Sequence, residues 1–398
     1  MRGLLGILLL ASAPAMAAHS VTFLIDLRQE IAAGRFDPTT AKVGVRGGVA
    51  PLSWASTAFA SDRDGDGRYQ VTVTFPRAPF GSQPVAYKFK VEREGTPNSG
   101  WEEGRNRQLK LAGERQTVER LFDSPPAPVA RERSGDIRTH PSFGSKHVPA
   151  RDVQVYLPPG YDRDASRHFP VLYLQDGQNV FDAGAVGMEW QVDETAELLI
   201  RSGAIEPLIV VAVSNTEARM DEYSPTFVDR TLPDGRRVHG GGKAPLYAQF
   251  LVDELKPFID RTYRSRPGPR STAVGGASHG GLVSLFLALE HPEVFGQALV
   301  MSPSAMWDQD VLIRRVRTLP RKLPVRFWVD VGSLESETMV SAAHRLRDAL
   351  VRRGWVEGKD LRFVEQPEGG HDEISWASRM PDALRFLWPG TGRAPAPQ

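Results

Sequence analysis

The sequence predicts an α/β fold, in which helices cover both faces of a mostly parallel sheet, preceded by a small all-β domain. In the second part of the chain, strongly apolar strands alternate with amphipathic helical stretches. In the first part, shorter strands are separated by turn clusters. A proline-rich piece at 123–128 divides the two parts, because proline cannot pair in a central strand. With 398 residues, the chain is long enough for one large core or two smaller ones.

Composition and charge exclude several classes of function. The chain has 49 Lys and Arg residues against 48 Asp and Glu residues, a formal net charge of +1, so no basic excess is available to bind nucleic acid. Cysteine is absent, which excludes disulfides, thiol catalysis and thiolate metal sites. A nucleophile must therefore be Ser, Thr, Asp or Lys, and no metal or organic cofactor is expected.

The N-terminal segment is typical of a signal peptide. A short positive start, Met1–Gly3, precedes the apolar run Leu4–Leu10, and Ala15-Met16-Ala17 is a small-x-small cleavage site. We expect cleavage of 1–17 after Ala17 and a periplasmic or secreted protein. No stretch is long and uncharged enough to span a membrane.

Residues 19–122 are expected to form an immunoglobulin-like β-sandwich, followed by a linker over 123–134. The segments Val21–Ile25, Tyr69–Phe75 and Val85–Val91 carry the β-branched and aromatic residues of strands. Asp62–Gly67 resembles the start of a calcium loop, but Val73 occupies the twelfth position, where a bidentate glutamate is needed. A hairpin turn is therefore the favoured interpretation.

The second domain is expected over 135–390, with a disordered tail at 391–398. Its predicted strands are Val171–Leu174, Leu208–Val213, Thr272–Gly275 and Val325–Val329.

A Gly-x-Ser-x-Gly motif, Gly276–Gly280, lies between the strand Thr272–Gly275 and the helical stretch Leu282–Leu289. A serine between a strand and a helix in this motif is typical of the nucleophile elbow of α/β-hydrolases, where a tight turn requires small neighbours. Ser278 is the predicted nucleophile. The alternative is a glycine-rich turn that only packs a helix against the sheet.

A serine nucleophile needs a base, which in α/β-hydrolases comes last in the chain. His371 lies in a glycine-rich loop after the strand-like Leu361–Glu365 and is the predicted base. His279 adjoins the nucleophile, and we interpret its ring as pocket wall.

The acid that orients the histidine should follow the penultimate strand. Asp330, Glu335 and Glu337 are the candidates. Glu335 is favoured because it lies on a loop that can turn toward His371, with Asp330 in reserve. The order Ser278, Glu335, His371 matches the hydrolase order.

The oxyanion hole requires two N–H donors, which we assign to His279 and, in the turn Asp176–Asn179, to Gln178. Four residues near strand ends are candidates for contacting substrate, or else are simply structural: Trp190, Arg219, Tyr223 and Trp307.

With these motifs in order, residues 135–390 resemble the putative-esterase group of α/β-hydrolases, which includes esterase D, feruloyl and acetylxylan esterases, enterochelin esterases and mycolyltransferases. The resemblance implies Ser278 as nucleophile, His371 as base and a Gly-x-x-acid motif at Gly332–Glu335, where glutamate replaces the commoner aspartate. The other matching motifs are Val155–Tyr161, Tyr173–Asn179, Glu222–Pro225, Glu254–Asp260, Met301–Ser304 and Gly369–Asp372.

Residues 19–122 resemble a family-20 starch-binding module in the pieces Pro51–Trp54, Tyr87–Phe89 and Trp101–Arg107. The resemblance implies that two tryptophans stack on glucose rings while a lysine and an asparagine bind hydroxyls. These roles fall on Trp54, Trp101, Lys88 and Asn106. The alternative is a pair of core tryptophans.

The sequence therefore predicts an exported serine esterase that acts on an ester of a carbohydrate or similar polyol, with α-glucan as a further partner of the first domain. Enterochelin esterases also carry an N-terminal β-domain, so a siderophore trilactone esterase is the first alternative. A catalytically inactive carbohydrate-binding protein is the second. The oligomeric state is left open.

Overall fold

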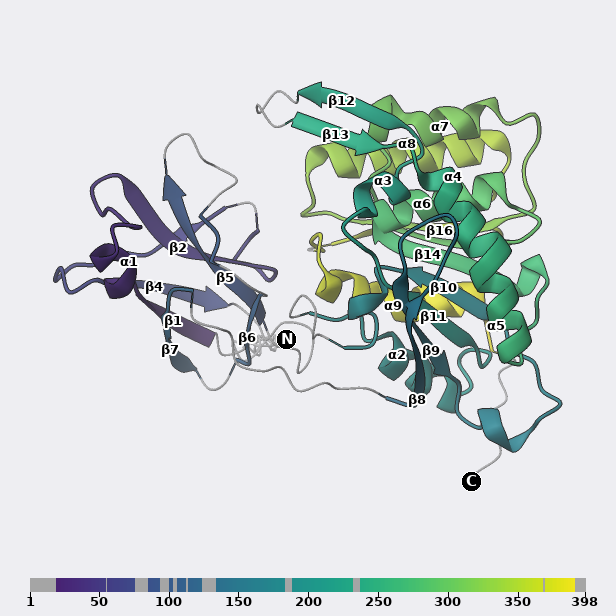
Figure 1. Cartoon of the computed structure of the whole chain (residues 1–398), viewed down its shortest axis with the longest axis horizontal. Coiled ribbons are helices and arrows are strands. Elements are labelled where there is room, and N and C mark those ends of the chain that lie inside the picture. The colour runs from purple at the N-terminus through teal and green to yellow at the C-terminus, as the bar shows by residue number, and fades with distance from the viewer. Residues whose placement is uncertain are drawn as a thin grey trace, which may run out of the picture. The chain divides into compact units, whose positions relative to one another are not determined.

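The computed structural model divides the chain into two units, 1–127 and 128–398, each described here by itself (Figure 1). The division falls inside the predicted linker. The predicted signal peptide 1–17, most of the linker (124–133) and the tail 391–398 lie outside the described residues. The structure describes residues 19–54, 56–75, 85–93, 100–102, 106–111, 114–123, 134–182, 188–231, 237–367 and 369–390.

The N-terminal unit contains two sheets around one core. Phe23, Val43, Phe75 and Phe89 are all buried in it, as alternation of apolar residues along the strands requires. The strand orders are β4-β1-β7 and β3-β2-β5-β6. The elements are β1 (His19–Asp26), α1 (Arg28–Ala32), β2 (Ala41–Gly47), β3 (Ala58–Phe59), β4 (Arg68–Phe75), β5 (Val85–Arg93), β6 (Arg107–Leu109) and β7 (Arg115–Leu121).

The loop before β4 is stabilised by hydrogen bonds between its own backbone and a side chain of the same loop. The Asp62 carboxylate accepts hydrogen bonds from the N–H groups of Gly65 and Gly67, at 2.8 and 2.9 Å. Ser61 and Gln70 pair antiparallel across the loop, as in a hairpin.

The C-terminal unit is built on an eight-stranded sheet of order β17-β16-β15-β14-β10-β11-β9-β8. The strands from β17 to β11 run parallel, and β9 and β8 are antiparallel to their neighbours. The strands are β8 (Asp136–Phe143), β9 (Arg151–Leu157), β10 (Val171–Gln175), β11 (Ile209–Val213), β14 (Thr272–Ser278), β15 (Gln297–Pro303), β16 (Arg326–Gly332) and β17 (Leu361–Gln366), with a separate hairpin of β12 (Phe227–Thr231) and β13 (Arg237–Gly241).

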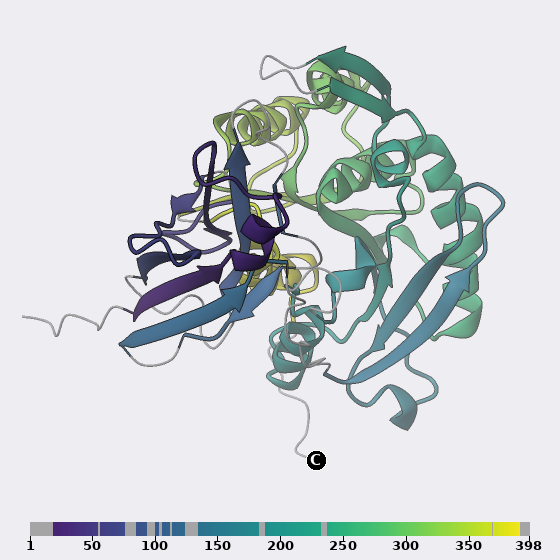
Figure 2. The same cartoon turned by 60° about the vertical axis from the view of Figure 1, so that its left-hand side comes forward.

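Helices cover both faces of this sheet, as Figures 1 and 2 show. The helices are α2 (Val192–Arg201), α3 (Arg219–Tyr223), α4 (Ala244–Gln249), α5 (Lys256–Thr262), α6 (His279–Glu290), α7 (Trp307–Thr318), α8 (Glu337–Arg353) and α9 (Glu373–Leu387), with the π-helix η3 (Phe250–Leu255) and the 3-10 turns η1 (Tyr161–Arg163), η2 (Gly177–Asn179) and η4 (Pro269–Ser271).

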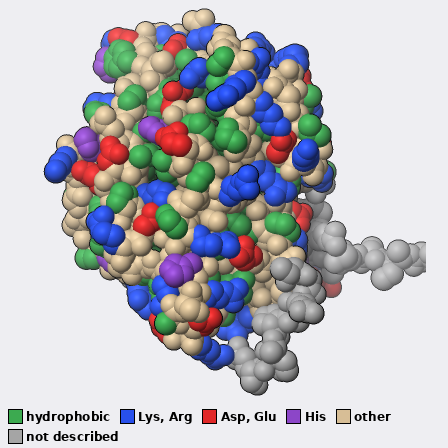
Figure 3. All heavy atoms as spheres, turned by 90° about the vertical axis from the view of Figure 1, so that its right-hand side faces the viewer, with side chains coloured by type: hydrophobic (Ala, Val, Ile, Leu, Met, Phe, Trp, Pro, Cys, Tyr) green, Lys and Arg blue, Asp and Glu red, His purple; other side chains and the backbone are tan. Residues whose placement is uncertain are grey.

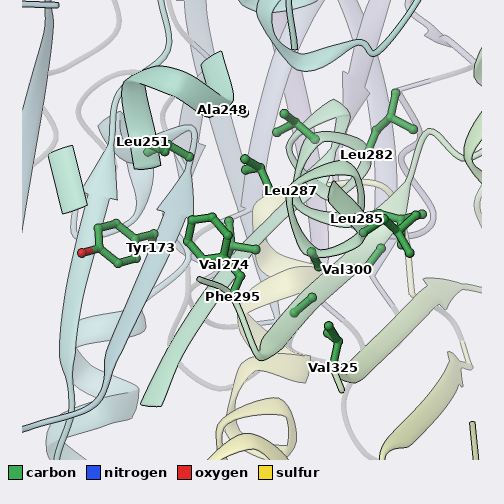
Figure 4. Close-up of a cluster of buried hydrophobic side chains, with 14 of the residues drawn as sticks. Tyr173, Ala248, Leu251, Val274, Leu282, Leu285, Leu287, Phe295, Val300 and Val325 are labelled. Atoms are coloured by element: carbon green, nitrogen blue, oxygen red, sulfur yellow. The ribbon is translucent and has the colours of Figure 1, made fainter. Parts of the chain in front are cut away.

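Successive strand residues enter different cores because side chains alternate across a strand. Val171 and Tyr173 pack with α4 to α8 in one hydrophobic core. Figure 4 shows some of the side chains of this core. Leu172 and Leu174 pack with α2 and α9 on the opposite face. The fully apolar strands of the sequence are thus explained by burial on both faces.

The surface seen in Figure 3 carries basic and acidic side chains interspersed with hydrophobic ones, in keeping with the formal net charge of +1. In the described part of the chain, no helix has the length and apolar character needed to cross a membrane.

Candidate active site

Ser278 lies at the turn from β14 into α6, with a left-handed φ of 58° and ψ of −124°. Such a backbone is costly for a residue other than glycine and is found where the surroundings enforce it. The turn is tight: a Cβ atom at Gly276 would lie 2.7 Å from the carbonyl carbon of Gly280. The small residues of the motif are thus required by the turn that presents Ser278.

His371 and Glu335 are brought together from two adjacent strand ends. Glu335 follows β16, His371 follows β17, and these strands pair in parallel. The His371 Nδ1 atom lies 3.0 Å from Glu335 Oε2. The Glu335 side chain is fully buried, whereas that of His371 is one-third exposed. A buried carboxylate on Nδ1 leaves Nε2 as the nitrogen available for proton transfer.

Asp330, the reserve candidate for the acid, is bound elsewhere. Its carboxylate accepts from Trp328 Nε1 at 2.6 Å and from the Ser302 N–H at 3.2 Å. Arg379 Nε lies 3.1 Å from Asp330 Oδ1. Complete burial raises the pKa of Asp330, although the Arg379 charge opposes this. The third candidate, Glu337, is exposed at the start of α8.

The Ser278 hydroxyl is half-buried, and its Oγ lies 3.5 Å from Ser304 Oγ. Within the described ranges, no hydrogen bond joins Ser278 Oγ to the His371 ring. Catalytic hydrogen bonds between nucleophile and base are often long before substrate binds. The elbow and the loop of His371 both follow strands of one sheet, β14 and β17.

The predicted oxyanion donors follow two neighbouring strands, β14 and β10. His279 is the first residue of α6, where backbone N–H groups lack intrahelical acceptors. Gln178 lies in η2 after β10, the strand next to β14, and its side chain accepts from the Asn215 N–H at 3.1 Å. The start of α6 and the loop after β10 approach each other closely, because a Cβ at Gly280 would lie 3.0 Å from Asp176 Oδ2. The donor roles of His279 and Gln178 stay predictions.

Arg219 is held by a carboxylate to which the sequence patterns assign no role. Its Nε and Nη2 atoms donate to the two oxygens of Asp176 at 2.6 and 2.8 Å, and Asn215 Nδ2 donates to the same carboxylate at 2.6 Å. The guanidinium therefore fixes the loop after β10. The sequence does contain an indication that Asp176 matters, because this residue belongs to the motif Tyr173–Asn179.

The three aromatic candidates for substrate contact are buried. Trp190 is 1% exposed and Tyr223 is not exposed at all, while the Tyr223 hydroxyl accepts from the Asp176 N–H at 3.3 Å. Trp307 is 7% exposed, and its ring lies edge-on to the His279 ring at 5.2 Å. As placed, these rings are packed in the interior rather than exposed. Their binding roles stay predictions.

Two titratable groups, His279 and Glu373, have protonation states that the sequence alone does not indicate. Burial, helped by the Arg219 charge, lowers the pKa of His279 to about 4, so this ring is neutral at neutral pH. Burial, with the Asp372 and Asp176 charges, raises the pKa of Glu373 to about 7. Glu373 Oε1 accepts from Asn179 Nδ2 at 2.8 Å.

In the N-terminal unit, Trp54 and Trp101 lie together but are tilted. Their ring centroids are 6.2 Å apart and their planes differ by 53°. Arg46 and Lys90 lie over the Trp101 ring at 5.3 and 5.5 Å. Both tryptophans are half-buried, as are the other two predicted sugar ligands, Lys88 and Asn106.

An eight-stranded mixed sheet between helices, with a serine on a strand-to-helix turn, is the architecture of α/β-hydrolases. The chain matches the model of the family described as putative esterase over residues 149–387, and it belongs to that family. The chain is accordingly an esterase, a carboxylic ester hydrolase, rather than an inactive carbohydrate-binding protein.

Three similar proteins illustrate the range of the family. An uncharacterized protein of Bacillus subtilis, YbbA, is 26% identical over 245 residues, 60% of this chain and 92% of its own. The ferri-bacillibactin esterase BesA of the same organism is 26% identical over 223 residues, 52% of this chain and 74% of its own. The enterobactin esterase structure from Shigella flexneri has a TM-score of 0.62 at 17% identity and covers 94% of both chains, which shows a shared fold.

Proposed function

We propose that this chain is a serine esterase in which Ser278 is the nucleophile, His371 the base and Glu335 the acid. The observation that carries the proposal is the 3.0 Å contact between His371 Nδ1 and the buried Glu335 carboxylate, together with a strained serine at the strand-to-helix elbow. A carboxylate on Nδ1 stabilises the imidazolium that forms when Nε2 accepts the serine proton.

The reaction follows from these roles. His371 Nε2 takes the Ser278 proton as Oγ attacks the ester carbonyl carbon, and the N–H groups of His279 and Gln178 stabilise the oxyanion. The intermediate collapses to acyl-Ser278, and His371 protonates the leaving alcohol. Water, deprotonated by the same nitrogen, then releases the acid. Neutral His279 adds no positive charge that would oppose protonation of His371.

The test is hydrolysis of p-nitrophenyl acetate and butyrate by the wild type and by Ser278→Ala, with a stopped-flow search for a burst of p-nitrophenol. We expect a burst from the wild type and loss of turnover by at least about 10³-fold in the variant. Ser284, a buried serine of α6 whose hydroxyl donates to the Gly280 carbonyl at 2.7 Å, offers a matched control as Ser284→Ala. Activity that survives in Ser278→Ala would overturn the mechanism.

For the substrate, we favour the ester bonds of a siderophore trilactone. The support is that a relative is a ferri-bacillibactin esterase and that an enterobactin esterase shares the fold over 94% of the chain, N-terminal unit included. An ester on a carbohydrate or similar polyol is the second substrate class. It is supported by the paired rings of Trp54 and Trp101, which would hold α-glucan on the N-terminal unit.

The two substrate classes are separated by kcat/KM values for ferric enterobactin and for feruloylated and acetylated xylo-oligosaccharides. We expect the trilactone to be preferred by at least about tenfold. A preference for the sugar esters would favour the second class. We further propose export by the N-terminal signal peptide, tested by the mass of the protein recovered from its host, which should lack 1–17.

A further inference from the structure

Behind the triad, the hydroxyl of Ser302 lies at the centre of a buried network. Ser302 belongs to β15, the strand between the nucleophile strand β14 and the acid strand β16, and it is not exposed at all. Its Oγ is hydrogen-bonded to Glu335 Oε1, to Trp376 Nε1 at 3.1 Å and to Arg379 Nη2 at 2.8 Å. Three side chains from the acid loop and α9 thus meet at one hydroxyl.

The direction of each hydrogen bond follows from the chemistry of the groups. The indole N–H of Trp376 and the guanidinium of Arg379 can only donate, and a serine hydroxyl has one proton and two lone pairs. Since Trp376 and Arg379 occupy both lone pairs of Ser302 Oγ, its proton must go to Glu335 Oε1.

This donation has consequences for Glu335. Its Oε1 atom also accepts from the Gly332 N–H at 2.8 Å, and the Arg379 Nη2 atom lies 4.0 Å away. Two hydrogen-bond donors and a nearby cation therefore fix the position of this oxygen. The other oxygen, Oε2, is then left to accept the Nδ1–H of His371 at 3.0 Å.

We propose that Ser302 is a positioning residue for the reaction, whose hydroxyl holds the Glu335 carboxylate in place and thereby holds His371 in the Nδ1–H tautomer. The inference rests on the proposed function. The backbone of Ser302 is constrained in keeping with this role, because its φ is 37° and its N–H donates to Asp330 Oδ1, which also contacts Arg379. Trp376 adds a second constraint, since its ring lies edge-on to that of His371 at 5.2 Å.

The first test is Ser302→Ala, assayed with p-nitrophenyl acetate. We expect kcat to fall by about 10- to 100-fold with KM within about twofold, because the ester does not contact Ser302. The downfield proton resonance of the His371 Nδ1–H should weaken or disappear, as it should in Glu335→Gln. Ser302→Gly, which accepts the positive φ without strain, is the second variant if the alanine protein folds poorly.

Ser265→Ala is the matched control, since Ser265 is also buried and donates to a carboxylate, Asp260 Oδ1, at 2.6 Å. It lies after α5, outside the catalytic machinery, so its loss should leave kcat and the Nδ1–H resonance unchanged. A wild-type kcat and an intact resonance in folded Ser302→Ala or Ser302→Gly would overturn the proposal.

A double-mutant cycle shows whether Ser302 acts through Glu335. In a Glu335→Gln background, Ser302→Ala should lower kcat by less than about twofold, because residue 335 no longer offers His371 the acceptor through which Ser302 would act. A full additional loss would contradict the proposal. Failure of the proposed function is distinct, because it would appear as activity that survives in Ser278→Ala.

Discussion

At the scale of single residues, the site depends on how two neighbouring buried carboxylates are kept apart. Asp330 and Glu335 share the cation Arg379, but Asp330 is bound by Trp328 and by the Ser302 backbone, so only Glu335 offers an oxygen to His371. Glutamate suits this position because its side chain is longer than that of aspartate. One carboxylate oxygen accepts from the N–H of Gly332 in the same loop, and the other reaches His371.

The division between the two carboxylates predicts different consequences of neutralising them. In Glu335→Gln an amide N–H₂ group can face the His371 Nδ1–H, which disturbs the tautomer, so kcat for p-nitrophenyl acetate should fall by about 10²- to 10⁴-fold at similar KM. Asp330→Asn leaves Arg379 buried without its full partner and should lower the free energy of unfolding by about 3 kcal/mol. Steady-state kinetics and urea unfolding measure the two effects. A larger kcat loss in folded Asp330→Asn than in Glu335→Gln would contradict this assignment.

The raised pKa of Glu373 predicts a pH-dependent stability. The folded protein retains a proton up to about pH 7 that the unfolded chain releases near the usual value of 4.5, so the contribution of Glu373 to stability is greatest below pH 4.5 and falls as pH rises to about 7. Glu373→Gln keeps an oxygen for Asn179 and cannot ionise. Near pH 8, the free energy of unfolding of this variant should exceed that of the wild type by about 1–2 kcal/mol, a value reduced because the Glu373 side chain is partly exposed. Near pH 4, the two proteins should be equally stable.

Urea unfolding at both pH values is the measurement for Glu373→Gln. Glu217→Gln, at an exposed position, is the control and should follow the wild type at both. Equal stabilities of wild type and Glu373→Gln near pH 8 would show that the folded protein does not retain this proton.

At the scale of elements, the parts of the site that could be predicted from the sequence are those formed by local motifs. The strand, turn and helix around Ser278 are contiguous, so the elbow was predictable. The pairing of Glu335 with His371 required only that two successive strands lie side by side. The network at Ser302 was not predictable, because Trp376 and Arg379 lie more than 70 residues further along the chain and meet it only by packing of α9.

Helix α9 also places the base, since its N-cap residue, Asp372, directly follows His371. The Asp372 carboxylate accepts from the Ser375 N–H at 2.8 Å. Asp372→Ala should lower the free energy of unfolding by about 0.5–2 kcal/mol and also lower kcat, whereas Asp372→Asn keeps a capping oxygen and should preserve both. Urea unfolding and p-nitrophenyl acetate kinetics on both variants are the measurements. Equal losses in the two variants would show that the charge of Asp372, rather than its cap, is what matters.

At the scale of the whole molecule, the two units raise the question of what the N-terminal unit contributes. Its aromatic pair is tilted by 53°, and two cations lie over the Trp101 ring, which is different from an open platform for sugar rings. Sequence resemblance named the residues Trp54 and Trp101, but their orientation depends on the packing of separate strands and loops.

Trp101→Ala therefore separates the two proposals for the N-terminal unit. If the unit binds α-glucan through its tryptophans, the variant should lose amylose affinity by at least about fivefold, since a stacked ring contributes about 1 kcal/mol or more, while p-nitrophenyl acetate turnover stays unchanged. If the unit instead serves a siderophore esterase, the wild type should not bind amylose in a pull-down or by calorimetry. The kinetics with p-nitrophenyl acetate should then be the same for the variant and the wild type, because the proposed triad lies within the C-terminal unit. Because the proposed substrate is a siderophore trilactone, we expect the second outcome, and tight amylose binding by the wild type would reverse that expectation.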